Sequence, residues 1–282
     1  RDAILSRGLE MCIRDRYLDL GLITSFVPAA SSFAGDIDFL FDLITIIVGF
    51  WFVITLATLF YFMIRFRRRE GVKALYISGE KHSEKVWTHY PHYGVIAFDV
   101  FLIGFVIVVW VNVKQTLPAN EDTIRAIGQQ WSWSFVHTGA DGKLDTEDDV
   151  NTVNDLHVIK DNTYHFELQS RDVLHNFAIP AFRLRQDTIP GRTIRGWFKP
   201  TISGTFDLQC AEICGRGHSM MFAAITVHPD RKSYDETMDA IRAGTYESHF
   251  EKKRQLGPVP LPFTVSKSET DSPYAIELAQ SF

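Results

Sequence analysis

The sequence is poor in cysteine, with three among 282 residues, at positions 12, 210 and 214. So few cysteines exclude a small fold that is stabilised by several disulfides. An excess of positive charge is also missing: 29 basic and 34 acidic residues give a formal net charge of -5, which argues against a general nucleic-acid binder. No CxxCH motif is present, so a covalently attached haem c is not expected. With 46% hydrophobic and 22% charged residues, the chain is neither a disordered tail nor a polytopic transporter.

Two long apolar runs stand out from this average. Residues 43–64 contain no charge, and residues 93–113 are interrupted only by Asp99. A membrane span needs ~20 mostly apolar residues, so both runs predict transmembrane helices. The loop between them, residues 65–92, carries seven basic residues: Arg65, Arg67, Arg68, Arg69, Lys73, Lys81 and Lys85. A short basic loop stays in the cytoplasm, which places both ends of the hairpin in the periplasm or an equivalent space.

These runs divide the chain into four predicted parts. Residues 1–38 form an N-terminal lead-in, residues 39–114 the hairpin, residues 115–250 an outer domain, and residues 251–282 an extended tail. Within the lead-in, residues 1–16 are patternless and include a string that resembles a translated sequencing-adapter scar, so Cys12 receives no functional weight. We expect residues 20–34 to be a flexible connection to the first span.

The outer domain shows the period of β-strands. Apolar and polar residues alternate over 164–169 and 206–210, and residues 222–227 form another short apolar run. Proline and glycine separate these segments, which predicts a small sandwich or barrel. Residues 235–243 predict one short helix.

One stretch of twelve residues, 210–221, is rich in metal-binding side chains. It contains Cys210, Cys214, His218 and two methionines, and these soft or borderline donors suit copper better than magnesium or calcium. His175, at a predicted strand end, can add a second imidazole. Zinc is a competitor, although its sites usually use CxxC spacing and no methionine. A disulfide between the two cysteines is a further alternative in an oxidising compartment. One methionine is expected to be core filler.

Three motifs together resemble subunit II of the haem–copper oxygen reductases of the cytochrome c oxidase type. They are CxExCGxxHxxM at 210–221, DVLHxFxIP at 172–180 and QWxWxF at 130–135, and the resemblance extends from residue 36 to about residue 242. It implies an all-β, cupredoxin-like Greek-key barrel or sandwich behind a two-helix transmembrane hairpin. In this family the outer domain holds CuA, a two-copper electron carrier.

The resemblance also implies a role for each site residue. The copper ligands would be His175, Cys210, Glu212, Cys214, His218 and Met221, with Glu212 contributing its backbone carbonyl. The Glu212 side chain would reach a magnesium ion shared with subunit I. Met220 would then be the core filler. Trp131 matches the position through which electrons from cytochrome c reach CuA, and Trp133 is expected to be packing.

The family further implies partners and a location. Subunit I, which carries the haems and CuB, and subunit III would be neighbours, and cytochrome c or a similar small carrier would be the donor. Glu84 resembles the glutamate at the mouth of a proton path into subunit I of a proton-pumping oxidase. The chain is expected to cross the bacterial inner membrane twice, with the copper domain in the periplasm.

Charge patterning adds two expectations about surfaces. Residues 121–161 contain nine acidic and three basic residues, and this negative patch would steer a lysine-rich cytochrome c. Its densest part, within residues 140–149, also weakly resembles a calcium loop. A basic patch is expected, from the resemblance, to face subunit I: Arg183, Arg185, Arg192, Arg195 and Lys199.

Three other functions fit the sequence less well. The equivalent subunit of a quinol oxidase lacks the copper ligands, all of which are present here. A membrane-anchored copper carrier needs an exposed, exchangeable site and leaves Trp131 and Glu84 unexplained. A nitrous oxide reductase shares the copper loop but needs a large second domain.

Overall fold

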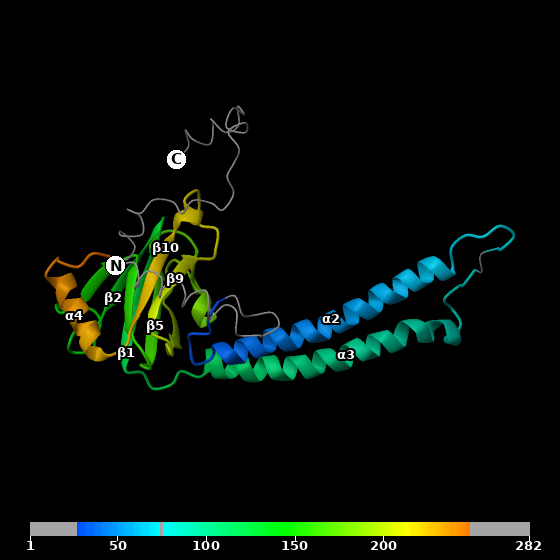
Figure 1. The fold of residues 1–282 in the computed structure, drawn as a ribbon, viewed down its shortest axis with the longest axis horizontal. Coiled ribbons are helices and arrows are strands. Elements are labelled where there is room, and N and C mark those ends of the chain that lie inside the picture. Colours follow the sequence, from blue (N-terminus) through cyan, green and yellow to red (C-terminus); the bar gives the residue numbers. More distant parts are fainter. Residues whose placement is uncertain (1–26, 74–75, 249–282) are drawn as a thin grey trace, which may run out of the picture. The chain divides into compact units, whose positions relative to one another are not determined.

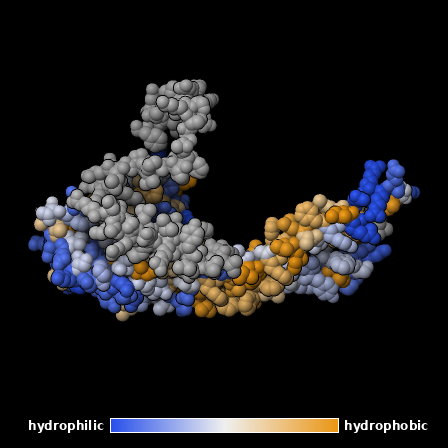
Figure 2. Space-filling view, in the orientation of Figure 1, coloured by the Kyte–Doolittle hydropathy of each residue, from blue (hydrophilic) through white to orange (hydrophobic). Residues whose placement is uncertain are grey.

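The computed structural model describes residues 27–73 and 76–248. Two long helices come first: α2 (Ala34–Arg65) and α3 (His82–Trp110), the latter extended by one π-helical turn, η1 (Val111–Gln115). Both are long and apolar enough to cross a membrane. Their side chains form the hydrophobic surface in Figure 2. The predicted membrane hairpin is therefore confirmed as two membrane-capable helices, and α2 begins before the apolar run does.

The rest of the described chain is mainly β-sheet. The strands are β1 (Asp122–Gln129), β2 (Ser132–His137), β3 (Val150–Val153), β4 (Asp155–Ile159), β5 (Tyr164–Ser170), β6 (His175–Ile179), β7 (Leu184–Thr188), β8 (Ile194–Phe198), β9 (Gly204–Cys210) and β10 (Phe222–His228). Two 3-10 turns, η2 (Pro180–Phe182) and η3 (His218–Met220), and one helix, α4 (Arg231–Arg242), complete the fold (Figure 1). The strands predicted within 164–169, 206–210 and 222–227 coincide with β5, β9 and β10.

The strands form two five-stranded sheets, in the orders β3-β2-β1-β5-β8 and β4-β10-β9-β6-β7. Most neighbours are antiparallel, but β1 pairs with β5 and β10 with β4 in parallel. Parallel neighbours need long connections, so the chain crosses between the sheets instead of forming only hairpins. The all-β, cupredoxin-like sandwich inferred from the resemblance is confirmed.

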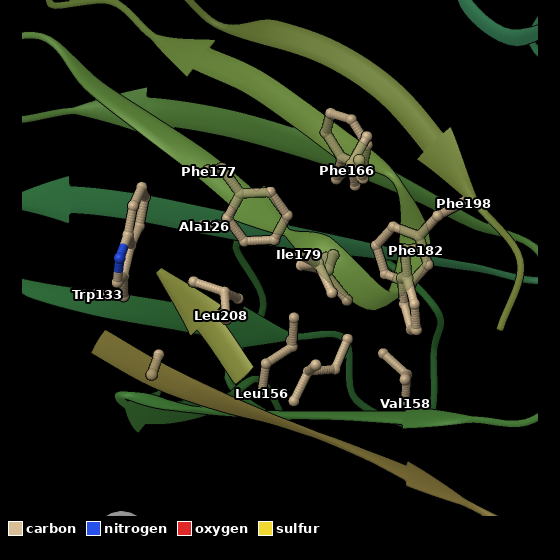
Figure 3. Packing of buried hydrophobic residues seen from close by; sticks show 14 of the residues in the cluster. Ala126, Trp133, Leu156, Val158, Phe166, Phe177, Ile179, Phe182, Phe198 and Leu208 are labelled. Carbon is tan, nitrogen blue, oxygen red and sulfur yellow. The ribbon is translucent and has the colours of Figure 1, made fainter. Parts of the chain in front are cut away.

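Aromatic side chains fill the space between the sheets (Figure 3). Trp133 from β2 packs edge-on against Phe177 from β6, with ring centroids 5.6 Å apart. All five residues of β6 are buried, so the strand that begins with His175 is held by the core on both faces. The expected packing role of Trp133 is confirmed by its complete burial.

Helix α4 is longer than predicted at its N-terminal end. It begins at Arg231, four residues before the predicted start, because the Asp230 carboxylate caps it by accepting a hydrogen bond from the Ser233 N–H at 2.8 Å. The pattern of apolar residues alone could not place that first turn, which is polar and stabilised by the cap.

The connection before the first helix is packed against the sandwich, which corrects the expectation of a flexible lead-in for its described part. The Ala30 N–H donates to the Ala181 carbonyl at 2.7 Å, and the Thr201 N–H donates to the Ala30 carbonyl at 2.9 Å. Ala30 and Phe33 are buried, and the Phe33 ring packs edge-on against Trp197 at 5.3 Å. The hydropathy of the sequence does not predict this contact, because the hydrogen bonds that hold it are made by backbone groups.

An ion pair fastens the same junction. The Arg183 guanidinium donates to both carboxylate oxygens of Asp38 on α2, at 2.6 and 2.9 Å, and also to the Val27 carbonyl at 2.9 Å. Both side chains of the pair are mostly shielded from solvent. The Arg183 charge is thus paired within this chain, and the expectation that Arg183 belongs to a patch facing another subunit stays a prediction.

We expect Arg183→Gln to loosen this junction. The substitution removes a bidentate, partly buried ion pair, and hydrogen bonds to charged groups contribute about 2 kcal/mol. Hydrogen exchange on the full chain should show the free energy of opening at the Ala30 and Ser32 amides lowered by that amount. Arg231→Gln, which removes an exposed i,i+4 pair with Asp235, is the matched control and should leave those amides unchanged.

Candidate metal centre

The soft donor residues meet at one end of the sandwich. His175 is the first residue of β6, and Cys210 is the last residue of β9. These strands are neighbours in one sheet, where Cys210 pairs with Phe177, two residues after His175. Cys214 and His218 lie on the loop between β9 and β10, and Met221 closes that loop. The loop is drawn in yellow in Figure 1. Two adjacent strands and one loop thus bring together residues that are 35 positions apart in sequence.

The donor atoms form a compact cluster. The two thiol sulfurs are 3.8 Å apart. Cys210 Sγ lies 3.9 Å from His175 Nδ1 and 3.2 Å from the Glu212 carbonyl oxygen. Cys214 Sγ lies 3.6 Å from His218 Nδ1 and 3.8 Å from Met221 Sδ. Each thiol therefore has its own imidazole, and the pair has one carbonyl and one thioether beside it.

Both cysteines are free thiols, so the disulfide alternative is not the state of this structure. Burial disfavours the thiolate of Cys210, but the hydrogen bonds from His175 and from the backbone outweigh burial and lower the Cys210 pKa to about 6. Burial and the negative charge of Cys210 raise the pKa of Cys214. A negative charge is thus already favoured on one sulfur, and a thiolate is the form that binds metals.

The two methionines differ clearly in the exposure of their side chains. Met221 is 1% exposed and lies in the donor cluster, whereas Met220 is 66% exposed. The prediction that Met220 fills the core is therefore wrong. It projects from the end of η3, whereas Met221, which lies between η3 and β10, is the one turned inward.

Asp172 links the cluster to the neighbouring β1–β2 loop. Its Oδ1 lies 2.8 Å from His175 Nε2, and its Oδ2 accepts a hydrogen bond from the Gln130 N–H at 2.7 Å. The Gln130 side chain donates to the Cys214 carbonyl at 2.7 Å. With Nε2 held by a carboxylate, Nδ1 of His175 is left to face Cys210. Our sequence reasoning missed Asp172 and Gln130, although Asp172 stands only three residues before His175.

The Trp131 indole covers the metal-binding loop from outside. A Cβ atom on Gly217 would lie 2.4 Å from Trp131 Cδ2, and one on Gly215, whose φ is +123°, would lie 2.8 Å from the Gln130 side chain. The glycines of the CGxG motif therefore allow the loop to approach Trp131 closely. The indole is still 40% exposed, so it reaches both the loop and the solvent.

These donors fit copper. His175, Cys210 and Cys214 offer ligand atoms within 4.8 Å of one another, and all three residues are buried. Thiolate, imidazole and thioether donors together are the set expected for copper, while the methionine has no use in a zinc site. The residues present could hold a metal with little access for solvent.

Two other predicted site residues are Glu212 and Glu84. Glu212 follows Cys210 by two positions, and its side chain is half-buried. Glu84 is half-buried in the first turn of α3, where it accepts hydrogen bonds from the Gly79 N–H at 2.9 Å and from the Ser78 hydroxyl. The structure thus brings the Glu212 carbonyl to the metal cluster and leaves Glu84 in the first turn of α3, away from that cluster.

We expect Asp172→Asn to weaken the centre without unfolding the domain. The substitution keeps the shape but removes the charge that orients and polarises His175, and changes to such supporting partners cost about 10- to 100-fold in metal affinity. Loss of a negative charge beside the centre should also raise its reduction potential. Both are measurable by copper titration and redox titration. Glu147→Gln, the same kind of change on an exposed remote loop, should leave both values as they are.

A membrane-anchored β-sandwich with a buried thiolate, imidazole and thioether cluster is the class of protein that this geometry defines. Residues 122–228 match the family model described as cytochrome C oxidase subunit II, periplasmic domain. The chain is 33% identical over 227 residues to the alternative cytochrome c oxidase subunit 2 of Bradyrhizobium diazoefficiens, covering 73% of this chain and 80% of that protein. It belongs to the cytochrome c oxidase subunit II family.

Two further similarities are found, one to a curated relative and one to a solved structure. Cytochrome c oxidase subunit 2 of Cereibacter sphaeroides is 26% identical over 254 residues, with 79% of this chain and 82% of that protein covered. The crystal structure of the periplasmic domain of subunit II of cytochrome oxidase (CoxB) of Bradyrhizobium japonicum is similar with a TM-score of 0.41 and 29% identity, over 46% of this chain and all of that one.

Proposed function

We propose that His175, Cys210, Cys214, His218, Met221 and the Glu212 carbonyl hold a binuclear copper centre of the CuA type, through which electrons enter a cytochrome c oxidase. The chain is a subunit of that complex by its family. The observation that carries the proposal is the pair of free, buried thiols 3.8 Å apart, each with its own imidazole. Such a centre, when bound, supplies a one-electron carrier that changes little in geometry between its two redox states.

The protein's own residues prepare the site for this role. The strand ends of β6 and β9 fix His175 and Cys210, and the Asp172 carboxylate fixes the imidazole ring. Rigid ligands leave little to rearrange when the charge of the centre changes. The buried cysteines and Met221 keep water away, so no open position is offered to a substrate. This arrangement favours the relay of electrons over the binding of oxygen.

Trp131 is the residue we assign to electron transfer from the donor. Its aromatic side chain contacts the metal-binding loop and is also open to solvent. The donor would be cytochrome c or a similar small carrier. Subunit I, with its haems and CuB, would receive the electrons, and subunit III would complete the complex.

Three finer assignments are part of the same proposal. The Glu212 side chain would hold a magnesium ion shared with subunit I, and Glu84 would stand at the mouth of a proton path. The chain would cross a bacterial inner membrane twice, with the copper domain in the periplasm. Support comes from the two membrane-capable helices, the basic loop between them and the match to a periplasmic domain. The predicted domain limits at residues 38, 114 and 250 remain predictions.

Metal analysis of the full chain tests the proposal. Purified in detergent and loaded with copper, the chain should bind two copper ions and take up a competing zinc ion only weakly. One tightly held zinc ion per chain, or a single copper ion, would contradict it. A copper carrier would release its metal quickly to a chelator, whereas the buried cluster should retain it.

A further inference from the structure

The exposed residues around Trp131 point to a different kind of donor surface from the one that the sequence suggested. Trp131 lies in the loop between β1 and β2, and three other loops end at the same end of the sandwich: residues 171–174, 189–193 and 211–221. These loops carry an exposed apolar face, which consists of Trp131, Val173, Leu174, Ile213, Met220 and Phe222, the first residue of β10. Ile213 is 83% exposed and Met220 66%. Large apolar side chains gathered on a surface around a functional site mark a contact with a partner.

The charges on these same loops are few and slightly positive in sum. They are Arg171, Asp172, Arg192, Glu212 and Arg216. The two carboxylates are partly withdrawn from a partner, because Asp172, whose side chain is 30% exposed, binds His175 and the Gln130 N–H, and Glu212 is half-buried in the metal-binding loop. The three arginines are exposed. A partner approaching Trp131 therefore meets apolar side chains and guanidinium groups.

The dense acidic part of the negative patch, residues 138–149, lies away from Trp131, and we call it the acidic segment. It connects β2 to β3 and begins after His137, at the opposite end of β2 from Trp131. Six strand residues separate the two, which is about 20 Å. Asp145 belongs to this segment, and its carboxylate lies 2.6 Å from the Arg125 guanidinium on β1. Arg125 also pairs with Glu167. Charges are screened over about 8 Å at physiological salt, so this segment steers a donor at Trp131 only weakly.

We propose that the apolar face around Trp131 docks an electron-carrier protein whose own contact face is apolar with an uncharged or acidic rim, and that a lysine-ringed carrier is not its matched partner. This inference rests on the proposed function and names the partner of the same site. It replaces the expectation that the acidic segment recognises a lysine-rich cytochrome c. Apolar contact supplies the affinity, and the arginines favour a rim without lysines.

Two forms of one donor separate these alternatives. The probes are a cytochrome c whose haem edge is ringed by lysines and the same protein with its lysines acetylated, and each reduces the copper-loaded oxidase complex in stopped-flow experiments between low and physiological salt. We expect the acetylated donor to react at least as fast as the native one. The rate with the native donor should not fall as salt is added. A native donor that is much faster at low salt and slows steeply with salt would overturn the proposal.

Two charge reversals of equal size show which part of the surface governs the rate of reduction by the donor. Arg216→Glu changes the charge beside Trp131, and Lys143→Glu makes the same change within the acidic segment, on an exposed side chain. With the native donor, Arg216→Glu should raise the rate about fourfold at low salt, and Lys143→Glu should leave it nearly unchanged. The reverse order would overturn the proposal. Ile213→Ser should slow both donors, since it removes apolar contact, and equal rates would count against the apolar face.

The copper content and spectrum of every variant are measured alongside the rates. If the wild-type chain fails to bind copper as a binuclear centre, the proposed function itself fails. If copper is bound normally but the acidic segment governs the rates, only the present inference fails.

Discussion

Cys214→Ser should abolish the binuclear centre. Cys214 Sγ stands at the centre of three other donors, since it lies within 3.8 Å of Cys210 Sγ, His218 Nδ1 and Met221 Sδ. A serine hydroxyl stays protonated at neutral pH and is a hard oxygen donor, so it cannot replace a thiolate toward copper. We expect bound copper to fall from two ions to at most one per chain. Oxidase turnover should fall by at least ~100-fold, more than the loss of a supporting residue costs.

The control for this variant is Met220→Leu. Met220 is a neighbour of Met221 on the same loop, but its side chain is exposed. Its replacement should leave copper content and the absorption spectrum unchanged. If Cys214→Ser kept both copper ions, the cluster would not be the copper site, whatever the fate of activity.

Trp131→Phe should slow electron transfer from the donor and leave the copper centre intact. Phenylalanine keeps an aromatic ring over the glycines of the loop but loses part of the surface that the donor touches. Truncating a tryptophan at the centre of a contact commonly costs ~2 kcal/mol, and the smaller change to phenylalanine should lower the second-order rate constant about tenfold. Stopped-flow reduction of the oxidase complex measures that constant.

Trp87→Phe is a matched control, because Trp87 is also exposed but lies on α3, next to the basic loop between the helices. It should have no effect on the rate. A purely structural role of Trp131 would give the opposite pattern: the variant domain would unfold more easily, while the copper that remained bound would be reduced at the normal rate.

Much of the fold could be predicted because its signals are local. The two apolar runs, the alternation in β5 and β9, the short apolar run of β10, and the spacing of Cys210, Cys214, His218 and Met221 are all visible in short stretches of sequence. Its place at a predicted strand end made His175 a candidate for the second imidazole, and its role as a copper ligand came from the resemblance, since 35 residues separate it from Cys210. The structure places His175 there by setting β6 beside β9.

What could not be predicted depends on contacts between distant segments. The docking of residues 27–33 uses backbone hydrogen bonds to Ala181 and Lys199, which leave no pattern in the sequence. Arg183 was grouped with other arginines by sequence proximity, whereas Asp38, its partner, lies 145 positions away. The acidic segment was assigned to the donor by its charge, and its distance from Trp131 became visible only once the direction of β2 was known.

Electron paramagnetic resonance of the copper-loaded, partly reduced full chain tests the central claim most directly. If Cys210 and Cys214 hold a binuclear centre, one unpaired electron should be shared equally, and the hyperfine pattern should come from two equivalent copper nuclei. A pattern from a single copper nucleus, or a chain that retains zinc and gives no copper signal, would contradict the account.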